Sequence, residues 1–362
     1  MTATPILQFG TSRFLQAHAD LFVSEARAEG QDVGPITVVQ SSGDAARAAR
    51  LSALSDGFDV RIEGMEGGAP VRRVVRVDSV ARTLSTAADW AEVERVFVDE
   101  ARIVLSNTGD SGFDLRPADD DATPSQAMSY PAKLTHLLRA RHGAGGAPIQ
   151  VMPMELVADN GAVLRARVRE LAGEGAFRDW LDTGVTWVNS LVDRIVSQPL
   201  EPAGAVAEPY ALWAIEDVPG LIVPCHHPAL RVVPSLAGIE ALKLFILNLG
   251  HSWMADQWLQ DPDFTPDLVR LFTARREASL RRLYEGEVLP AFDAAGMGAE
   301  ARDYVETTVA RFANPFLDHR IADIAGNHAQ KVERRIGAFL DWAKAQGDTG
   351  RKPVLERIAS RA

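Results

Sequence analysis

Cysteine is nearly absent from the 362-residue chain, which carries only Cys225 and so cannot form a disulfide within itself. This usage suits a reducing compartment and predicts a cytoplasmic protein. No apolar run approaches the roughly 18 residues that a membrane-spanning helix needs. The N-terminal stretch MTATPILQFG lacks a basic region followed by a long apolar run, so we expect no secretory signal and no membrane partner.

Positive charge is also scarce, because the formal net charge is -11. A nucleic-acid-binding protein needs a basic face, so this class of function is disfavoured. A local pocket can still be basic, which leaves small anionic ligands open. The length suggests two domains, on a guide of about 150 residues for each. The oligomeric state is not fixed by the sequence, and we expect a monomer or a homodimer.

Strand-like and helix-like stretches alternate over the first two thirds of the chain. Strands are expected at residues 5–9, 35–40, 102–107, 148–156, 185–196 and 211–217, with a strand pair at 71–83, and helices at 13–29, 90–101, 131–141 and 160–173. This alternation predicts an α/β fold with a mostly parallel, doubly wound sheet. Only helical patterns follow from about residue 236. We therefore predict a Rossmann-like domain at 1–230 and an all-helical domain at 231–362.

The first predicted strand leads into QFGTSRFLQAH, which raises the question of a phosphate-binding turn. In dinucleotide-binding folds, glycines in the first strand–helix turn let the backbone approach the pyrophosphate. Gly10 fits the first glycine position, whereas Ser12 and Leu15 stand at the second and third. On this pattern alone, an ordinary strand–helix turn and a nucleotide-binding turn are both open.

The second predicted strand ends in VVQSSGDAARAAR. An acidic residue at this point would bond the ribose 2′-hydroxyl of NAD. Gln40 stands there instead, and Ser41, Ser42 and Arg47 are suited to a 2′-phosphate. The choice between NAD and NADP is therefore open at this stage.

The stretch ALKLFILNLGHSW (241–253) is an apolar helix that carries Lys243, Asn248 and His251. At 3.6 residues per turn, Asn248 and His251 fall about 140° and about 80° from Lys243, so the three share one face. A lysine in a low-dielectric cleft can act as a base, an amide can stabilise an oxyanion, and a histidine can bond a hydroxyl. In the structural alternative, Lys243 pairs with Glu240 and the other two are satisfied core groups.

The stretch CHHP (225–228) offers a possible set of metal ligands. Adjacent side chains of an extended segment point to opposite faces, so Cys225, His226 and His227 supply at most part of a zinc site. No partner cluster is evident, so we expect no metal. Loop residues near the domain boundary are the favoured interpretation, with a substrate contact from either histidine left open.

The pattern Lys-x4-Asn-x2-His resembles a motif of the long-chain mannitol dehydrogenase family of polyol and sugar-acid oxidoreductases. Further stretches resemble family segments in the same order: ILQFGTSRFLQAH (6–18), VLSNTGDSGFDL (104–115), SYPAKLTHLLRAR (129–141), MPMELVADNG (152–161), VNSLVDRIV (188–196), EPYALWAIED (208–217) and RFANPFLDHRIADIAGNHAQKVERR (311–335). The resemblance spans most of the chain. The segments PMEL, PAKLT and EPYALWAIE most resemble those of the tagaturonate and fructuronate reductase branch.

This resemblance implies hydride transfer between NAD, with NADP not excluded, and a keto sugar acid or ketose, which gives the hydroxy acid or polyol. It implies that Lys243 is the general acid/base, that Asn248 polarises the reacting oxygen and that His251 bonds a neighbouring hydroxyl. The cofactor-binding residues that it implies are Gly10, Thr11, Ser12, Arg13, Phe14, Gln40, Ser41, Asn107 and Thr108. The substrate-binding residues are Glu155, Asn160, Asp193, Arg194, His319, Lys331 and Arg335.

The sequence departs from the family pattern at three points. Leu156 follows Glu155 where the mannitol branch has a second asparagine, which bears on the substrate more than on the activity. Ser12 replaces the usual second glycine, and the chain ends sooner after Arg335 than the family usually does. Two alternatives stay open: an inactive sensor that binds a nucleotide or sugar acid, and an epimerase with tightly bound NAD.

Overall fold

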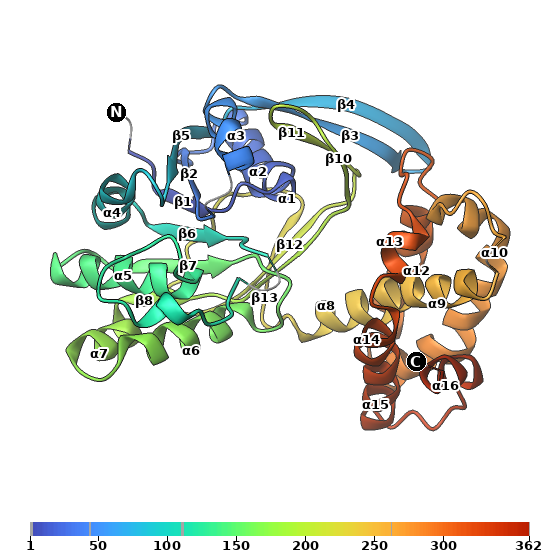
Figure 1. The fold of residues 1–362 in the computed structure, drawn as a ribbon. Coiled ribbons are helices and arrows are strands. Elements are labelled where there is room, and N and C mark those ends of the chain that lie inside the picture. The colour runs from blue at the N-terminus through green and yellow to red at the C-terminus, as the bar shows by residue number, and fades with distance from the viewer. Residues whose placement is uncertain (1–2, 43–44, 110–111, 262, 362) are drawn as a thin grey trace. The chain divides into compact units, whose positions relative to one another are not determined.

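The computed structural model describes residues 3–42, 45–109, 112–261 and 263–361, without the side chains of 45–49. It divides into two compact units. Unit 1 comprises the chain up to Ile62 together with Arg72–Leu236, and unit 2 comprises Glu63–Val71 together with the chain from Ala237 onward. Each unit has a hydrophobic core of its own. Figure 1 labels their elements along the chain.

Within the described residues, unit 1 is built on a six-stranded sheet in the order β5-β2-β1-β6-β7-β8. Its strands are β1 (Ile6–Phe9), β2 (Ile36–Gln40), β5 (Val80–Ser85), β6 (Ile103–Ser106), β7 (Ile149–Pro153) and β8 (Val185–Trp187). Every pairing in this sheet is parallel. The order is that of the dinucleotide-binding Rossmann fold, whose two halves meet between β1 and β6. Phe9 pairs in register with Val39 and with Ser106, so three strand ends come level there.

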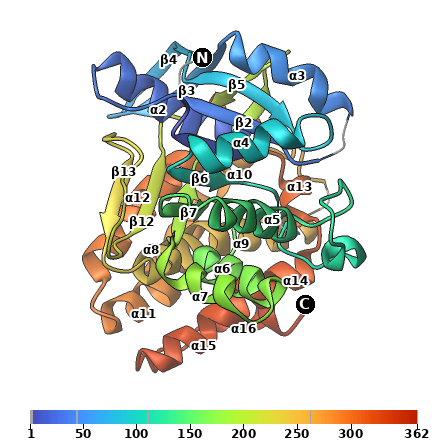
Figure 2. The ribbon, with the colours of Figure 1, turned by 90° about the vertical axis from the view of Figure 1, so that its left-hand side faces the viewer.

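Helices cover both faces of this sheet because successive strand side chains alternate between them. Ile6 and Val38 face one core, which includes α2, whereas Leu7 and Val39 face the other core, which includes α4 to α7. Figure 2 shows α4 to α7 following one another across one face. The helices are α1 (Arg13–Gln16), α2 (Ala19–Ala28), α3 (Ala45–Ser55), α4 (Trp90–Asp99), α5 (Tyr130–Gly143), α6 (Asn160–Ala172) and α7 (Ala176–Thr183), with a short 3-10 turn η1 (Pro117–Asp120).

Two smaller sheets complete the strands of the described chain. One has the order β10-β11-β3-β4 and the other the order β13-β12-β9. Their strands are β3 (Phe58–Glu66), β4 (Ala69–Val77), β9 (Ser190–Asp193), β10 (Val196–Pro199), β11 (Gly204–Ala207), β12 (Leu212–Glu216) and β13 (Leu230–Val233). The tip of the β3–β4 hairpin is the part that belongs to unit 2. There the side-chain amide of Asn314 donates to the carbonyl of Glu63 at 3.4 Å.

Strands do form at 71–83, as predicted, but β4 and β5 do not pair with each other, because they belong to different sheets. The chain turns between them at Asp78 and Ser79. The Asp78 backbone amide donates to the Ser24 hydroxyl, and the Ser79 hydroxyl donates to the Asp20 carbonyl. These bonds to α2 hold the turn against unit 1 and direct β5 into the parallel sheet beside β2.

The single helix predicted at 13–29 is instead two helices, α1 and α2, separated at His18. His18 leaves helical geometry (φ -131°, ψ -98°), and its Nε2 lies 3.0 Å from the Leu212 carbonyl. Its buried ring stacks on Phe14 and packs against Phe22. This tertiary contact outweighs the apolar helical spacing on which the prediction rested.

Unit 2 is helical in its described part from Ala237 onward, apart from an isolated bridge between Leu268 and Arg320. Its helices are α8 (Ala237–Leu242), α9 (Leu249–Leu259), α10 (Val269–Leu283), α11 (Leu289–Ala294), α12 (Gly298–Phe312), α13 (Ile321–Ala325), α14 (His328–Val332), α15 (Ala338–Ala345) and α16 (Pro353–Ala359). Three π-helical segments join consecutive helices: η2 (Lys243–Asn248), η3 (Tyr284–Val288) and η4 (Glu333–Gly337). The predicted fold class, a Rossmann-like α/β part followed by a helical part, is confirmed.

Candidate functional site

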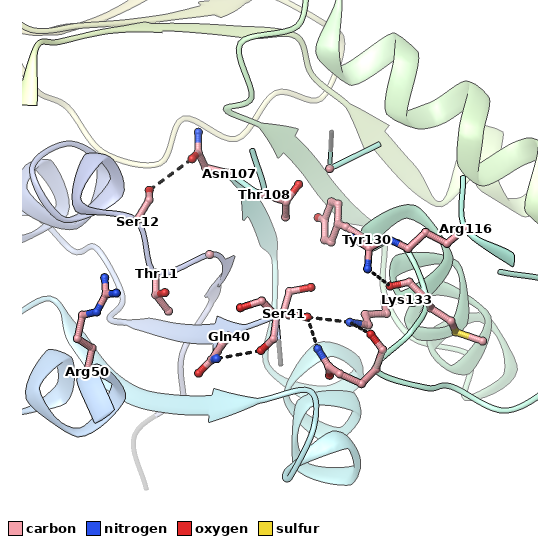
Figure 3. A pocket seen from close by; sticks show the side chains of 15 residues that line it. Thr11, Ser12, Gln40, Ser41, Arg50, Asn107, Thr108, Arg116, Tyr130 and Lys133 are labelled. Carbon is pink, nitrogen blue, oxygen red and sulfur yellow. Dashed lines mark hydrogen bonds between the residues drawn. The ribbon is translucent and has the colours of Figure 1, made fainter. Parts of the chain in front are cut away.

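A cavity of about 280 Å³ opens in unit 1 at the carboxyl ends of β1, β2 and β6. This is the point where the strand order reverses, which is where open α/β sheets bind ligands. Figure 3 shows the side chains that surround it. The lining comes from the turn after β1, the end of β2, helix α3, the end of β6, and the segment that leads into α5: Gly10, Thr11, Ser12, Gln40, Ser41, Ser42, Arg50, Asn107, Thr108, Gly112, Arg116, Gln126, Met128, Tyr130 and Lys133.

Gly10 lets two neighbouring strand ends approach closely. Its φ of +127° is a conformation that residues with a side chain rarely adopt, and an added Cβ would lie 2.6 Å from the Asn107 carbonyl oxygen. The Gly10 amide donates to the Val39 carbonyl at 3.0 Å, and the Asn107 amide donates to the Phe9 carbonyl at 2.9 Å. A bare backbone at this crossing is the feature that a dinucleotide turn requires.

Ser12 occupies the second glycine position without strain, since its φ is -66°. It is the N-cap of α1, and its Oγ accepts a hydrogen bond from the Leu15 amide at 3.2 Å. Arg13 and Phe14, both predicted to bind cofactor, do not line the cavity. The Arg13 guanidinium donates to Glu201 at 2.8 Å and to the Gly204 carbonyl at 3.0 Å, and Phe14 stacks on His18.

The end of β6 is tied to the end of β7 through a buried carboxylate. Oε1 of Glu155 accepts from both the backbone and the hydroxyl of Thr108 at 3.0 Å, and Oε2 accepts from Ser106 at 3.0 Å. The side-chain amide of Asn107 donates to the Met154 carbonyl at 2.8 Å. Burial raises the pKa of Glu155, and these hydrogen bonds oppose that shift. Glu155 therefore positions Thr108, and the Met154 carbonyl positions Asn107, which are both residues of the cavity lining.

Asn160, a predicted substrate residue, is also engaged within unit 1. Its Nδ2 donates to the carbonyls of Glu155 and Ser190, and its Oδ1 accepts from the amides of Gly161 and Ser190. These bonds use the side-chain amide to hold the start of α6 against β9. Leu156, between these two predicted residues, is 67% exposed.

Asp193 and Arg194 lie at the end of β9, also in unit 1. Arg194 is buried, and its guanidinium donates to the carbonyls of Glu208 (3.0 and 2.8 Å) and Ala17 (2.7 Å). Burial lowers the pKa of Arg194 to about 10, with Glu208 opposing the shift. Asp193 is buried and has interactions of its own. A substrate role for this pair stays a prediction.

At the end of β2, two side chains donate hydrogen bonds to the same backbone carbonyl, that of Ser41, and fix this corner of the cavity. The Ser41 carbonyl accepts from Lys133 Nζ and from Gln126 Nε2, both at 2.7 Å (Figure 3). Lys133 is 1% exposed. Burial, and then the charge of Arg116, lower its pKa to about 8. The Gln40 amide donates to the Ser42 carbonyl at 2.9 Å.

The sequence interpretation missed Arg50, Arg116, Gln126, Tyr130 and Lys133 as lining residues. Arg50 lies one helical turn after Arg47, so the i,i+3 spacing was a usable signal for it. The Arg47 side chain lies outside the described residues. Tyr130 and Lys133 lie in the SYPAKLT stretch, but their place in the cavity depends on how the loop before α5 folds back to the sheet. No local pattern encodes that path.

The predicted catalytic residues of unit 2 lie on η2 and α9. The segment from Lys243 to Asn248 is π-helical, with bonds of the i→i+5 type, so each residue turns through less than the 100° of an α-helix. Because Lys243 and Asn248 are five residues apart, the angle between their side chains around the helix axis is smaller than in an α-helix. Both are half-buried, and Lys243 already interacts with neighbouring groups. Segments of this kind occur frequently at functional sites.

His251 follows one turn later and is surrounded by basic groups. Its ring lies 5.2 Å from that of His319 and 4.6 Å from that of Phe312. Burial lowers the pKa of His251 well below its usual value, and the nearby charges of Arg335 and Lys331 lower it further. Among the described residues, His251 Nε2 is buried without a hydrogen-bond partner. A neutral imidazole with an unused nitrogen is suited to a hydroxyl ligand.

His319, Lys331 and Arg335 complete this group, which we call the basic cluster together with His251. The Arg335 guanidinium donates to the Asn248 carbonyl at 3.3 Å and to the Ser252 hydroxyl at 3.2 Å. Lys331 Nζ donates to the Ile324 carbonyl at 2.8 Å, and the pKa of Lys331 is lowered by burial and by Arg335. Residues far apart in sequence thus gather along one helical segment.

The CHHP stretch lies in unit 1, and His226 and His227 line a separate surface pocket with Glu29 and Gln31. Cys225 is buried and His227 Nε2 lies 3.0 Å from Glu25. No group of three possible metal ligands occurs among the described residues. The helices of the described chain include none that is long and apolar enough to span a bilayer.

The sheet order, the glycine crossing and the cavity at the switch point define a dinucleotide-binding Rossmann protein. A model of the mannitol dehydrogenase Rossmann domain matches residues 4–222. The chain belongs to the mannitol dehydrogenase family and is an oxidoreductase of that family.

Relatives of known name agree with this assignment. Altronate oxidoreductase of Klebsiella pneumoniae (strain 342) is 30% identical over 91% of this chain and 73% of its own length. Altronate oxidoreductase of Bacillus subtilis (strain 168) is 26% identical over 97% of this chain and 77% of its own length. The family assigned from the sequence, with its sugar-acid branch, is thereby confirmed.

Two solved structures share the fold. D-sorbitol dehydrogenase in substrate-free form matches with a TM-score of 0.79 and 21% identity, over 94% of this chain and 76% of that chain. The ternary complex of Pseudomonas fluorescens mannitol 2-dehydrogenase with NAD and D-mannitol matches with a TM-score of 0.79 and 19% identity, over 99% and 78%. At these identities the likeness concerns the fold.

Proposed function

We propose that the protein is a nicotinamide-dinucleotide-dependent reductase and dehydrogenase of a sugar acid, which interconverts a keto acid of the uronate type and the hydroxy acid. The observation that carries the proposal is the basic cluster beside Lys243 and Asn248 on one helical segment of unit 2. The names of the altronate oxidoreductases support a sugar acid over a neutral polyol. A ketose with its polyol is the second candidate, supported by the mannitol and sorbitol dehydrogenase structures.

The charge of the cluster favours an anionic substrate. Burial lowers the pKa of His251, and the nearby charges of Arg335 and Lys331 lower it further. Burial also lowers the pKa of His319, where the charge of Asp323 opposes the shift and Lys331 adds to it. The cations of the cluster are Lys331 and Arg335, which oppose one another, and a carboxylate that binds beside them would stabilise both charges. The net charge of the whole chain is -11, so this basic cluster is a local feature and not a general property of the surface.

In the proposed reaction, Lys243, Asn248 and His251 have one role each. When bound, the nicotinamide supplies or accepts a hydride at the reacting carbon. Lys243 Nζ gives a proton to the substrate oxygen during reduction and takes it back during oxidation. The side-chain amide of Asn248 donates a hydrogen bond to the same oxygen and stabilises its developing charge. Neutral His251 uses its unpartnered Nε2 to bond the hydroxyl of the neighbouring carbon.

The cavity of unit 1 fits the cofactor that these steps need. Gly10 lets the turn after β1 pass close to the Asn107 backbone, and Gly10, Thr11 and Ser12 line the cavity beside it. Asn107 and Thr108, held by Glu155 and Met154, stand on the other side of the switch point. We assign the dinucleotide to this cavity, and NAD is the form seen in the mannitol 2-dehydrogenase complex.

Turnover with a panel of substrates tests the proposal. The purified protein is mixed with NADH or NADPH and with keto-uronates and ketohexoses, and absorbance at the nicotinamide band is followed. We expect turnover of at least one keto-uronate. Lys243→Met should lower kcat by more than about a hundredfold, because general acid–base catalysis contributes roughly 10²–10⁴. Its dinucleotide affinity should stay unchanged.

The matched control is Lys344→Met, which removes an exposed lysine from α15 of the same unit. It should retain full turnover. Full activity in the Lys243→Met protein would refute the acid/base role. Tight dinucleotide binding without turnover of any keto-uronate or ketose would instead favour a sensor, and exchange of stereochemistry without net change at the nicotinamide band would favour an epimerase.

A further inference from the structure

The nucleotide cavity of unit 1 is lined by three cationic side chains, those of Arg50, Arg116 and Lys133. Its other described lining residues are neutral, so no carboxylate of the described chain faces it. Ligands of the NAD type carry two negative charges on the pyrophosphate, which the turn after β1 accommodates. The lining therefore has more positive charge than a pyrophosphate alone calls for.

The excess of positive charge includes the end of β2, where the adenosine ribose lies in Rossmann folds. An NAD-preferring site places a carboxylate here to accept from the ribose 2′-hydroxyl, and that carboxylate repels a 2′-phosphate. Gln40 takes this position, and its amide donates to the Ser42 carbonyl at 2.9 Å. The side chains of Ser41 and Ser42 follow, half-buried, along the same wall.

The backbone that presents these serines is fixed from behind. Lys133 and Gln126 each donate to the Ser41 carbonyl at 2.7 Å, and the Thr86 hydroxyl donates to it at 3.4 Å. Lys133 is itself buried, so its ammonium adds positive potential beneath this segment. Because the backbone of Ser41 and Ser42 is already fixed, a ligand can bind there without the cost of ordering this segment.

Arg50 supplies the charge that a 2′-phosphate would pair with. It projects from α3 on the same side of the cavity as Gln40 and Thr11 (Figure 3). Its charge also acts on Arg13, whose pKa is lowered first by burial and further by Arg50. The two guanidinium groups repel because both are positively charged, and the ion pair of Arg13 with Glu201 offsets part of this effect on Arg13. An anion beside Arg50 would relieve this repulsion.

We propose that the corner formed by Gln40, Ser41, Ser42 and Arg50 holds the 2′-phosphate of NADP(H), and that Arg50 is a specificity-determining residue for the phosphorylated dinucleotide. The guanidinium of Arg50 donates to the phosphate oxygens, and the hydroxyls of Ser41 and Ser42 donate beside it. The protein then uses NADP(H) at least as well as NAD(H). This inference rests on the dinucleotide site of the proposed function.

Binding titrations without substrate test this assignment. Quenching of protein fluorescence gives the Kd of NADPH and of NADH for the wild-type chain, and we expect NADPH to bind at least as tightly. Arg50→Gln should weaken NADPH by about 10–100-fold, the value of a hydrogen bond to a charged group, and change NADH by less than about threefold. Addition of 2′,5′-ADP should displace NADPH from the wild-type protein more effectively than 5′-ADP does.

A second variant covers the case in which Arg50→Gln disturbs α3. Ser42→Asp places a carboxylate at the corner and should weaken NADPH selectively by a similar factor. Arg102→Gln, an exposed arginine outside the cavity, should change neither affinity. Tight NADH binding with NADPH more than about a hundredfold weaker, or an equal loss of both in Arg50→Gln, would overturn the inference and leave the proposed function standing. Binding of neither dinucleotide would overturn both.

Discussion

At the scale of single residues, we expect Gly10 to control the proposed binding of a dinucleotide in the cavity. Two effects coincide there, since φ is +127° and an added Cβ would meet a backbone oxygen 2.6 Å away. A backbone atom cannot move aside as the end of a side chain can. Gly10→Ala should therefore weaken NADH or NADPH by more than about tenfold, which corresponds to roughly 1.4 kcal/mol. Fluorescence titration measures this directly.

Gly30 provides a control that separates these two effects. It also has a positive φ (+84°), but no atom lies within 4 Å of the position of an added Cβ. Gly30→Ala should lose stability through backbone strain, by about 1 kcal/mol or more, and keep its dinucleotide affinity. If both variants kept wild-type affinity, the close crossing of β1 and β6 would have no part in binding.

Sequence patterns and the family resemblance together predicted some lining residues of the cavity better than others. The topology could place five of them at the sheet edge, because they lie at the end of a predicted strand or directly after it: Gly10, Thr11, Ser12, Gln40 and Ser41. Arg13 and Phe14 were assigned with the same turn, but a helix directs successive side chains around its axis. Their side chains accordingly turn toward Glu201 and His18 instead.

At the scale of elements, the π-helical segment η2 controls where Lys243 and Asn248 lie. Its widened turn needs support from outside, and the buried hydroxyl of Tyr284 donates to the Ile246 carbonyl at 2.9 Å. Gly250 makes room for that hydroxyl, because an added Cβ would lie 2.1 Å from it. The path of η2, which carries Lys243 and Asn248, thus depends on a tyrosine of η3.

Tyr284→Phe should destabilise the protein by about 1 kcal/mol, the usual net value of one hydrogen bond. It should also lower kcat/KM for the keto acid, since η2 can relax toward α-helical geometry and rotate Asn248 away from Lys243. Dinucleotide affinity should not change, because the cavity belongs to unit 1. Calorimetry, steady-state kinetics and fluorescence titration measure the three quantities.

A pair of glycine variants sharpens this test. Gly250→Ala should lower both stability and kcat/KM more strongly than Tyr284→Phe, since it displaces the buried ring. Gly286→Ala lies in η3 with no atom within 4 Å of the added Cβ, and it should be neutral or stabilising by up to about 1 kcal/mol. Unchanged kinetics in Gly250→Ala would show that η2 does not control the catalytic geometry.

The sequence predicted the elements of the parallel sheet but not the features that depend on long-range contacts. Buried strands such as β1, β2, β6 and β7 are short, mostly apolar runs with one or two polar residues, and these are recognisable without a structure. The break at His18 arises from a bond to Leu212, about two hundred positions later, and η2 depends on Tyr284. Helical periodicity carries no record of such partners, so it predicted one straight α-helix in both places.

At the scale of the whole molecule, buried histidines and a buried aspartate change the stability in opposite directions as the pH changes. Burial lowers the pKa of His18 to about 3 from its ordinary 6.5, so the unfolded chain binds a proton that the folded chain does not. His251 behaves likewise. Stability is therefore full above pH 6.5 and falls as the pH decreases, by about 1.4 kcal/mol per pH unit for each group.

Asp20 acts in the opposite direction. Its carboxyl is buried on α2, and burial raises its pKa from 3.8 to about 7, while a hydrogen bond from Gln8 opposes the shift. The folded chain now binds the proton more tightly than the unfolded chain. Its contribution to stability is present below pH 3.8 and is lost as the pH rises to 7. Between these limits Asp20 offsets part of the histidine effect, which broadens the range of pH over which the fold is stable.

Replacement of Asp20 by asparagine removes that offset. At pH 8 the wild-type protein buries a carboxylate, so Asp20→Asn should raise Tm there, by at least about 2 °C. At pH 5 the wild-type carboxyl is protonated in the fold, and the advantage of the variant should shrink toward zero. The exposed Asp32→Asn should change Tm at neither pH. Calorimetric scans at pH 5 and pH 8 decide the matter, and a gain from Asp20→Asn of equal size at both would contradict the raised pKa of this carboxyl.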